Sequence, residues 1–451
     1  MKIESKSNQS IRKVKGPSLT NFLRRIGEYP AFHFYKLMGE YGEIVRCSSL
    51  FYLISNPDIA KQILNLDQKG FSQEDFVGKR IKTVFGKGMV ISTAEIWASE
   101  RKILNPIFKP QAVHIFTSEA IIEIDKVLDS WVSYAKKNET FDFVNEMGNI
   151  AIMVSGKVLF DTEFKNVVSE VKNVVRAGTK YIASGLPFYM PFWIPTITHL
   201  RLRRVNRRID NLLKPIVQNR LGLKELKNNF ADTLIKTLGK PDAPNSDQRL
   251  MLDEMKTMLA GGYFPVACSL SIFWHVLGQH PEYFLKLSKE IRSKPIGYNF
   301  AEHFYRDFPI TTKVILETMR LYPVAFSIWR KSKIDQNIDG LFIPKGKTIC
   351  ISIFNIHRNP TLWEQPDRFI PERFDEEKSR SRASHHFMPF GWGNRSCIGD
   401  NYAMMVIYLT IIRIIQKFDV EILPGQELKV KSAPLISPKK VYAKVSVIRE
   451  D

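Results

Sequence analysis

The stretch Phe387-Met-Pro-Phe-Gly-Trp-Gly-Asn-Arg-Ser-Cys-Ile-Gly399 decides the fold of this chain. It is a glycine-rich turn that leads a cysteine to the start of an apolar helix, which we expect to run from near Cys397 to about Lys417. The glycines permit positive φ angles and close approach of the backbone. Amide groups of the turn and the helix N-terminus are expected to stabilise Cys397 as a thiolate rather than a thiol. An isolated cysteine in a turn is more often a buried structural residue, so the spacing of its neighbours has to decide.

Five positions of this turn, Phe390, Gly393, Arg395, Cys397 and Gly399, match the pattern F-x-x-G-x-R-x-C-x-G. The turn therefore resembles the cysteine loop of the cytochrome P-450 family. The resemblance implies that the cofactor is haem b and that Cys397 is the axial ligand of its iron. It also implies that Phe390 and Gly399 adjoin the cofactor and that Arg395 pairs with a haem propionate. A cysteine ligand donates electron density that favours O–O cleavage.

Two further arginines stand in motifs of the same family. Trp97-Ala-Ser-Glu-Arg101 places Trp97 and Arg101 at i, i+4, which alone indicates only an amphipathic helix. It is similar to the W-x-x-x-R motif, whose two side chains contact a propionate. Arg330 occupies the place of the arginine before the strand pair that contains Asp335 and Gly340. Three arginines for two propionates is chemically sensible, because each forms charge-assisted hydrogen bonds.

Glu317-Thr-Met-Arg320 places an acid and a base on one helical face at i, i+3. Such a pair is usually a surface ion pair, but apolar neighbours here indicate burial. The segment resembles the E-x-x-R motif of the family, and Pro371-Glu-Arg-Phe374 resembles the segment that supplies Arg373 as a third member. A buried Glu317–Arg320–Arg373 network would fix the chain before the cysteine rather than take part in chemistry.

The long apolar stretch at 251–278 departs from the family. We align Gly261 and Gly262 with its pair of small residues, so Phe264 and Pro265 stand where an acid and an alcohol are expected. Sliding by one residue gives Tyr263 and Phe264, and neither register supplies a carboxylate followed by a hydroxyl. Proline lacks an N–H, so the helix is expected to open or kink there. The usual proton relay also loses its side-chain donors.

Residue patterning predicts a mostly α protein with a smaller β-rich portion. Apolar residues at i, i+3, i+4 spacing predict helices at 97–107, 118–136, 145–159 and 202–220, and the stretch at 251–278 is predicted to be a helix buried all round. Short strands are expected at 44–46, 51–54, 338–344 and 347–353, and a short helix at 57–64. We expect one domain over 1–451, strand-rich at about 30–95 and 323–353 and at the C-terminus, and helical at about 95–320 and 397–418. The resemblance places the haem between the long central helix and the cysteine loop.

Charge and cysteine usage limit the partners. The 66 Lys+Arg against 46 Asp+Glu give a net charge of +20, which favours acidic partners. The cations are scattered apart from the cluster Arg201, Arg203, Arg204, Arg207 and Arg208, so nucleic-acid binding is not expected. The four cysteines form no C-x-x-C pair, which argues against a disulfide scaffold or a structural zinc site and favours a reducing compartment. No flavin or iron–sulfur domain is apparent, so electrons are expected from a separate acidic ferredoxin or flavodoxin.

The sequence predicts a soluble, cytoplasmic monomer. Residues 1–15 are polar and basic, unlike a signal peptide, and we expect no run to reach the about 18 apolar residues needed to span a bilayer. The apolar, proline-rich segment at 186–195 precedes the arginine cluster. It has two interpretations: a packed loop, or a substrate-access lid whose residues 186–208 rest on an anionic membrane.

The leading hypothesis is a haem-thiolate monooxygenase that oxidises a hydrophobic small molecule with dioxygen. Protons would then come from water or from the substrate. The missing acid–alcohol pair keeps a second hypothesis open, an enzyme that uses peroxide or rearranges an oxygenated substrate without dioxygen, as a peroxygenase, isomerase or dehydratase does. A third hypothesis is a haem protein that sequesters a ligand without turnover.

Overall fold

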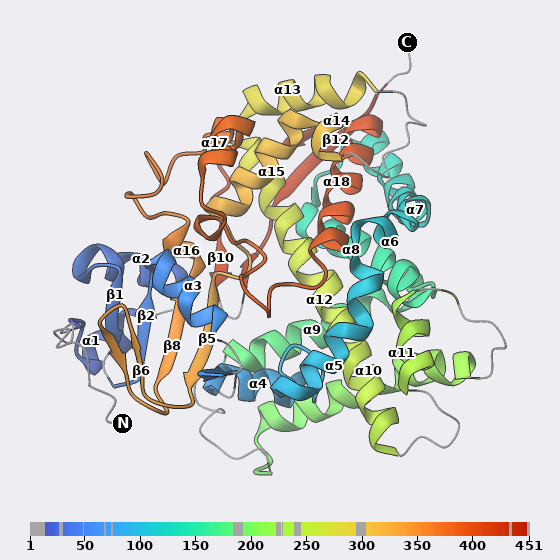
Figure 1. Cartoon of the computed structure of the whole chain (residues 1–451). Coiled ribbons are helices and arrows are strands. Elements are labelled where there is room, and N and C mark those ends of the chain that lie inside the picture. Colours follow the sequence, from blue (N-terminus) through green and yellow to red (C-terminus); the bar gives the residue numbers. More distant parts are fainter. Residues whose placement is uncertain are drawn as a thin grey trace, which may run out of the picture.

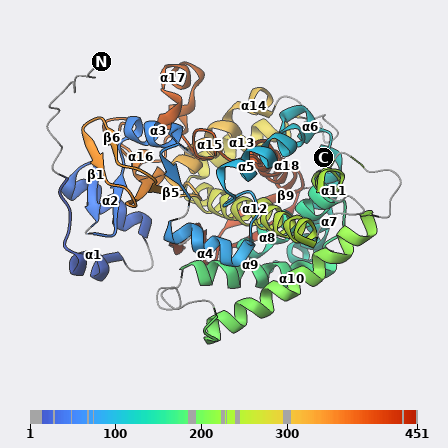
Figure 2. The same ribbon diagram turned by 60° about the horizontal axis from the view of Figure 1, so that its bottom comes forward.

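The computed structural model describes residues 14–448 apart from 27–29, 48, 67–68, 74, 184–192, 222–226, 228, 239–244, 295–303 and 433–434. A five-stranded sheet with the first helices lies at one side of the molecule, and the long helices fill the rest (Figure 1, Figure 2). The fold is therefore mostly helical with a smaller sheet portion, as predicted.

The main sheet has the order β1-β2-β8-β5-β3. Its β2 and β8 are parallel, whereas β1–β2, β5–β8 and β3–β5 are antiparallel. Its strands are β1 (Ile44–Cys47), β2 (Phe51–Ile54), β3 (Phe71–Ser72), β5 (Ser327–Ser332) and β8 (Thr348–Ser352). Smaller sheets are formed by β6 (Gln336–Ile338) with β7 (Leu341–Ile343), by β10 (Val430–Ser432) with β11 (Ile436–Pro438), and by β4 (Phe141–Asp142), β12 (Tyr442–Val447) and β9 (Phe418–Ile422).

The helices of the first half are α1 (Leu19–Ile26), α2 (Pro30–Tyr41), α3 (Pro57–Asn65), α4 (Phe76–Phe85), α5 (Ala94–Leu104), η1 (Asn105–Phe108), α6 (Pro110–His114), α7 (Thr117–Lys137), α8 (Phe143–Phe160), η2 (Lys165–Val167), α9 (Val168–Ala183) and α10 (Ile197–Leu221). Those of the second half are α11 (Phe230–Leu238), α12 (Asn245–Gly278), α13 (Pro281–Arg292), α14 (Phe304–Asp307), α15 (Pro309–Leu321), α16 (Ile353–Ile356), η4 (Pro371–Phe374), α17 (Glu376–Ser381), η5 (Ser384–His386) and α18 (Asp400–Lys417).

Helix α12 passes through the middle of the molecule and packs on α8 and α18 (Figure 1, Figure 2). These helices and α7 share one large hydrophobic cluster. Contrary to the sequence expectation, one helix among the described residues is long and apolar enough to cross a membrane, the part of α12 from Gln248 to Gly278. Because 67% of its apolar window is buried inside the protein, its hydropathy is that of a core helix.

Three local expectations need correction. The helix predicted at 97–107 ends at Leu104, because Pro106 follows and the chain turns into η1. The strand predicted at 338–344 is part of a hairpin, since Asp339 and Gly340 adopt positive φ angles of 52° and 76° between β6 and β7. Helix α12 continues through Pro265 without a break, so the expected opening does not interrupt it.

Candidate active site

The loop before α18 is a turn pinned by its own backbone. The amide of Cys397 donates to the carbonyl of Phe390 at 2.8 Å, and that of Ser396 donates to Gly393 at 3.1 Å. Gly393 has a φ of 75°, and a Cβ there would lie 2.9 Å from the carbonyl oxygen of Leu64 in α3. Only glycine meets both conditions without strain. The turn therefore lies against the end of α3 at Gly393 and holds Cys397 three residues before α18.

Cys397 is the exposed cysteine, whereas Cys47, Cys268 and Cys350 are buried. Desolvation by the surrounding protein raises the pKa of the Cys397 thiol to about 11, although the Gly399 amide and the Arg101 charge act in the opposite direction. In the protein alone, the hydrogen bond and the charge do not outweigh desolvation, so the thiolate stays a prediction for the iron-bound protein. A metal ion would change this, since a coordinating thiol is deprotonated outright.

Two of the three predicted arginines are held at the cysteine loop by contacts between the loop and α5. Arg101 in α5 donates from Nη1 to the carbonyl oxygen of Ser396 at 2.8 Å. The guanidinium of Arg395 lies over the ring of Trp97, 4.8 Å from its centroid. Arg330 lies on β5 with 4% of its surface exposed, and its charge acts on the buried carboxyl of Asp75. The motifs at 97–101 and 387–399 thus join into one cationic region.

Polar partners that the sequence did not indicate hold Arg395. Its Nη1 donates to Oε1 of Gln73 at 2.7 Å, and its Nη2 donates to the carbonyl oxygen of Ser92 at 3.0 Å. These residues precede α4 and α5 and carry no motif, so no sequence signal identifies them.

The Glu317–Arg320 pair is completely buried. Arg320 donates to both carboxylate oxygens of Glu317, at 2.7 and 2.8 Å, and Arg373 lies 3.4 Å from the same carboxylate. The amide of Ile370 also donates to Glu317 at 2.9 Å. Arg320 donates in addition to the carbonyl oxygens of residues 357, 366 and 368. Glu317 and Arg320 together thus fix the backbone at four positions between residues 357 and 370.

His357 connects this network to the cysteine loop. Its carbonyl oxygen accepts from Arg320, and its Nε2 accepts from the amide of Met388 at 2.9 Å. Burial lowers the pKa of His357 to about 3, and the neighbouring Arg320 acts in the same direction. The imidazole is therefore neutral and remains an acceptor, so Glu317, Arg320 and His357 position the start of the loop.

The accessible face of α12 carries the residues singled out in the sequence. Gly261 is exposed, and a Cβ there would meet nothing within 4 Å. Phe264 and Pro265, at i+3 and i+4, lie on the same face and are half-buried. Gly262 faces the other way, where a Cβ would lie 3.0 Å from Leu159. The accessible face thus presents neither a carboxylate nor a hydroxyl at 264 and 265.

A pair of buried carboxyls lies close to the arginines. Glu254 of α12 is 0% exposed and Glu100 of α5 is 8% exposed. Ser92 joins the pair to the arginines, because its Oγ donates to Glu100 at 2.9 Å and its carbonyl accepts from Arg395. Burial, together with the neighbouring Glu100 carboxyl, raises the pKa of Glu254 to about 9, and burial also raises that of Glu100. The pair therefore holds a proton at neutral pH. The position of Glu254 inside the apolar stretch at 251–259 was a sequence signal for a buried acid, but no sequence pattern indicated Glu100 as its partner.

The donor set of this region fits a haem. One exposed cysteine stands at the end of a rigid turn, with the permanent cations Arg101 and Arg395 beside it. An accessible helix face around Gly261 lies on α12, which packs against α18. A thiolate ligand, cations for two carboxylates and an open apolar face are what this cofactor needs.

The chain belongs to the cytochrome P450 family, whose family model matches residues 15–445. The protein is accordingly a P450-type monooxygenase whose cofactor is haem b.

Individual relatives are distant but cover most of the chain. It is 27% identical to Protein LUTEIN DEFICIENT 5 of Arabidopsis thaliana, over 87% of this chain and 69% of that protein. It is 28% identical to Cytochrome P450 3A25 of Mus musculus, over 86% and 80%. It is 24% identical to cyclooctat-9-en-7-ol 5-monooxygenase of Streptomyces melanosporofaciens, over 86% and 84%. A crystal structure of a cytochrome P450, CYP102L1, superposes with a TM-score of 0.80 at 21% identity, over 92% of this chain and 98% of that one. At this identity, the superposition on CYP102L1 shows a shared fold alone.

Proposed function

We propose that this monooxygenase oxidises a hydrophobic small molecule and that Cys397 would supply the thiolate ligand of the haem iron. The observation that carries the proposal is the exposed Cys397 at the end of a pinned turn, with Arg101 and Arg395 beside it. When bound, the haem supplies the activation of dioxygen that allows an oxygen atom to enter the substrate.

The chain's own residues would hold and orient the cofactor. Arg101, Arg330 and Arg395 would pair with the two propionates through charge-assisted hydrogen bonds. Arg101 and Arg395 would exchange their present hydrogen bonds to backbone and side-chain oxygens for these stronger ones. The ring of Trp97, over which the Arg395 guanidinium lies, would help to hold that cation in place. Phe390 and Gly399 would flank the thiolate, and the half-buried Phe264 would offer an apolar wall to the substrate.

Proton supply distinguishes two versions of this function. With no acid or alcohol at 264 and 265, protons would reach the reacting oxygen from water or from the substrate itself. The same residues favour a second candidate, a peroxide-using enzyme that needs no relay.

Turnover of the haem-loaded protein should be compared in two mixtures, one with NADPH, ferredoxin and its reductase, and one with hydrogen peroxide alone. Product that depends on the reductase supports the monooxygenase. Product from peroxide alone, with little gain from the reductase, supports the second candidate.

Electrons would enter across the face that carries the cysteine loop. Two lysines lie next to residues that contact this loop or α18. Lys102 follows Arg101, which donates to Ser396. Lys109 follows Phe108, whose carbonyl accepts from Asn401 in the first turn of α18. Both lysines are exposed. Together with the net charge of +20 they suit an acidic ferredoxin or flavodoxin as the separate electron donor.

A second surface suits contact with an anionic membrane. Residues 186–192 of the predicted lid lie outside the described residues. In the described remainder, Trp193, Ile197 and Leu200 are exposed by 76%, 79% and 48% and recur at i+4 and i+3. The exposed Arg201 and Arg204 follow on α10, which runs along the outer edge of the molecule (Figure 2). Such a face binds lipid by apolar insertion and by attraction to acidic headgroups.

Vesicle flotation tests this contact. The protein should float with phosphatidylserine-containing vesicles and not with purely zwitterionic ones, and Ile197→Asp should reduce flotation. Equal recovery with both vesicle types, or no effect of Ile197→Asp, would leave a packed loop as the better interpretation.

A further inference from the structure

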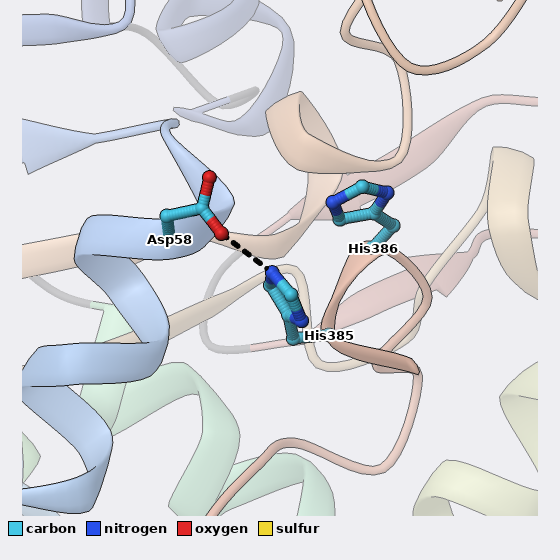
Figure 3. A group of neighbouring side chains, drawn as sticks. All are labelled: Asp58, His385 and His386. Carbon is cyan, nitrogen blue, oxygen red and sulfur yellow. Dashed lines mark hydrogen bonds and ion pairs between the residues drawn. The ribbon is translucent and has the colours of Figure 1, made fainter. Parts of the chain in front are cut away.

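A cluster of two histidines and an aspartate lies away from the haem-binding residues, between α3 and η5. Asp58 stands in the first turn of α3, and His385 and His386 end η5. Nε2 of His385 lies 2.8 Å from Oδ1 of Asp58. One potential ligand atom from each of the three residues lies within 4.8 Å of the other two. Figure 3 shows the carboxylate and both imidazoles around one space between the helix and the turn.

The donor types and separations suit a transition-metal ion. Imidazole nitrogen and carboxylate oxygen bind zinc at about 2.0–2.2 Å, so donors around a tetrahedral ion lie roughly 3.3 Å apart. The Asp58–His385 pair is already near that separation, and no gap exceeds 4.8 Å, so the widest has to close by at most about 1.5 Å. Asp58 can move, because 66% of its side chain is exposed.

His386 distinguishes this cluster from a simple His–Asp hydrogen bond. Within the part of the chain that the structure describes, no hydrogen bond to its imidazole is formed, and the ring lies 4.7 Å from that of His385. Burial lowers the pKa of His386, as do the neighbouring His385 and Arg382, while Asp58 raises it. A neutral imidazole is the form that binds a metal. Arg382 is the positive charge that opposes a cation here, and the Asp58 carboxylate balances it.

We propose that Asp58, His385 and His386 form a binding site for a divalent transition-metal ion of the zinc type. One carboxylate oxygen and two imidazole nitrogens would be the protein ligands, and water would complete the coordination.

The position of the site gives it a mechanical role. The ring of His385 lies 6.0 Å from that of Trp392 in the cysteine loop. Helix α3 also meets the loop at its other end, where Leu64 faces Gly393. A metal ion that joins α3 to η5 would therefore brace the loop that carries Cys397 from both ends of α3.

Zinc titration of the full-length, haem-loaded and metal-stripped protein, without a histidine tag, tests the proposal. Calorimetry should show one zinc ion per chain, and zinc should raise the thermal midpoint because it binds the folded state. Asp58→Asn and His386→Gln should each lower the affinity at least about tenfold, since even outer partners of metal ligands cost roughly 10–100-fold. His280→Gln is the matched control, because His280 and Glu282 on α13 form a two-residue pair at 3.3 Å. It should leave zinc binding unchanged.

Zinc binding that is absent, or that survives both Asp58→Asn and His386→Gln, would overturn the proposal. If His386→Gln loses haem, the zinc affinity of Asp58→Asn alone tests the proposal. Asp58→Asn should fold normally, because the Asp58 side chain is exposed and the N-cap of α3 is Asn56. The haem content of each variant is read from its Soret absorbance.

Discussion

Glu317 shows how much of the fold can depend on one side chain. Its carboxylate balances Arg320 and Arg373 and accepts from the Ile370 amide, while Arg320 serves three backbone carbonyls. The family spacing predicted these three charged residues. It did not predict that the imidazole of His357 accepts from the Met388 amide. That contact depends on the path of the chain after β8, which the motifs do not specify.

Glu317→Ala should leave the buried Arg320 and Arg373 without a compensating negative charge, which should lower the free energy of unfolding by about 3–5 kcal/mol. We expect little haem-loaded protein on expression, measured by Soret absorbance per unit protein. Glu376→Ala is the matched control, because Glu376 pairs with Arg380 on the exposed surface of α17. Normal haem content in Glu317→Ala would show that the network is dispensable.

The Glu100–Glu254 pair predicts a pH dependence of stability. The folded protein keeps a proton on Glu254, whose pKa is about 9, whereas the unfolded chain releases it near 4.5. The folded state thus binds more protons between these values, so this group lowers the free energy of unfolding as pH rises.

Glu254→Gln, which is always uncharged, removes this dependence. Its urea midpoint should therefore rise relative to wild type on going from about pH 6 to about pH 8. A constant difference between the two proteins across that range would mean that Glu254 is ionised in the folded state.

Among the elements, α12 both forms part of the hydrophobic core and presents an accessible face. Its buried faces form the core against α8 and α18, and its face at 261, 264 and 265 stays accessible. Hydrophobic periodicity predicted α7 and α8 to within two residues, because each has to bury a continuous stripe. Helices α10 and α12 begin five and six residues before their predicted starts, and the pattern did not predict the bounds of α9. It failed at Leu104 and at the hairpin of β6 and β7, where one proline and one pair of positive-φ residues outweigh the pattern.

Pro265→Thr tests the missing proton relay at this element. If water or substrate supplies protons, the added hydroxyl should raise the product formed per NADPH consumed with poor surrogate substrates, and should lower peroxide release. If the enzyme uses peroxide, turnover with peroxide should stay unchanged or fall. Pro265→Ala is the control for the backbone, because it restores the N–H without a hydroxyl. Efficient coupling with every substrate and no response to Pro265→Thr would show that another residue serves as the relay.

At the scale of the whole molecule, the site is assembled from distant parts of the chain. Helix α5, strand β5, helix α12 and the loop at 387–399 each contribute, and about 300 residues separate Arg101 from Ser396. Composition and periodicity do not indicate such an assembly, so the family motifs carried that part of the prediction. The partners of Arg395 at 73 and 92, which no motif marks, became visible only in the folded chain.

The exposed Lys102 and Lys109, on the face that carries the cysteine loop, predict that the rate of electron transfer from an acidic donor depends on their charge. Lys102→Glu and Lys109→Glu should each lower ferredoxin-driven turnover several-fold and weaken its dependence on salt, because steering of the acidic partner is lost. Lys289→Glu, on the exposed surface of α13, should change neither. Equal effects of all three substitutions would point to net charge rather than to a docking face.

The ligation of the haem iron by Cys397 is tested most directly by the spectrum of the reduced carbon monoxide adduct. A thiolate trans to carbon monoxide shifts the Soret band to the red, so wild type should show that band. Replacement of the buried Cys268 or Cys350 should preserve it. Cys397→Ser should lose it, even where haem remains bound. A red-shifted band that persists in Cys397→Ser would contradict the account.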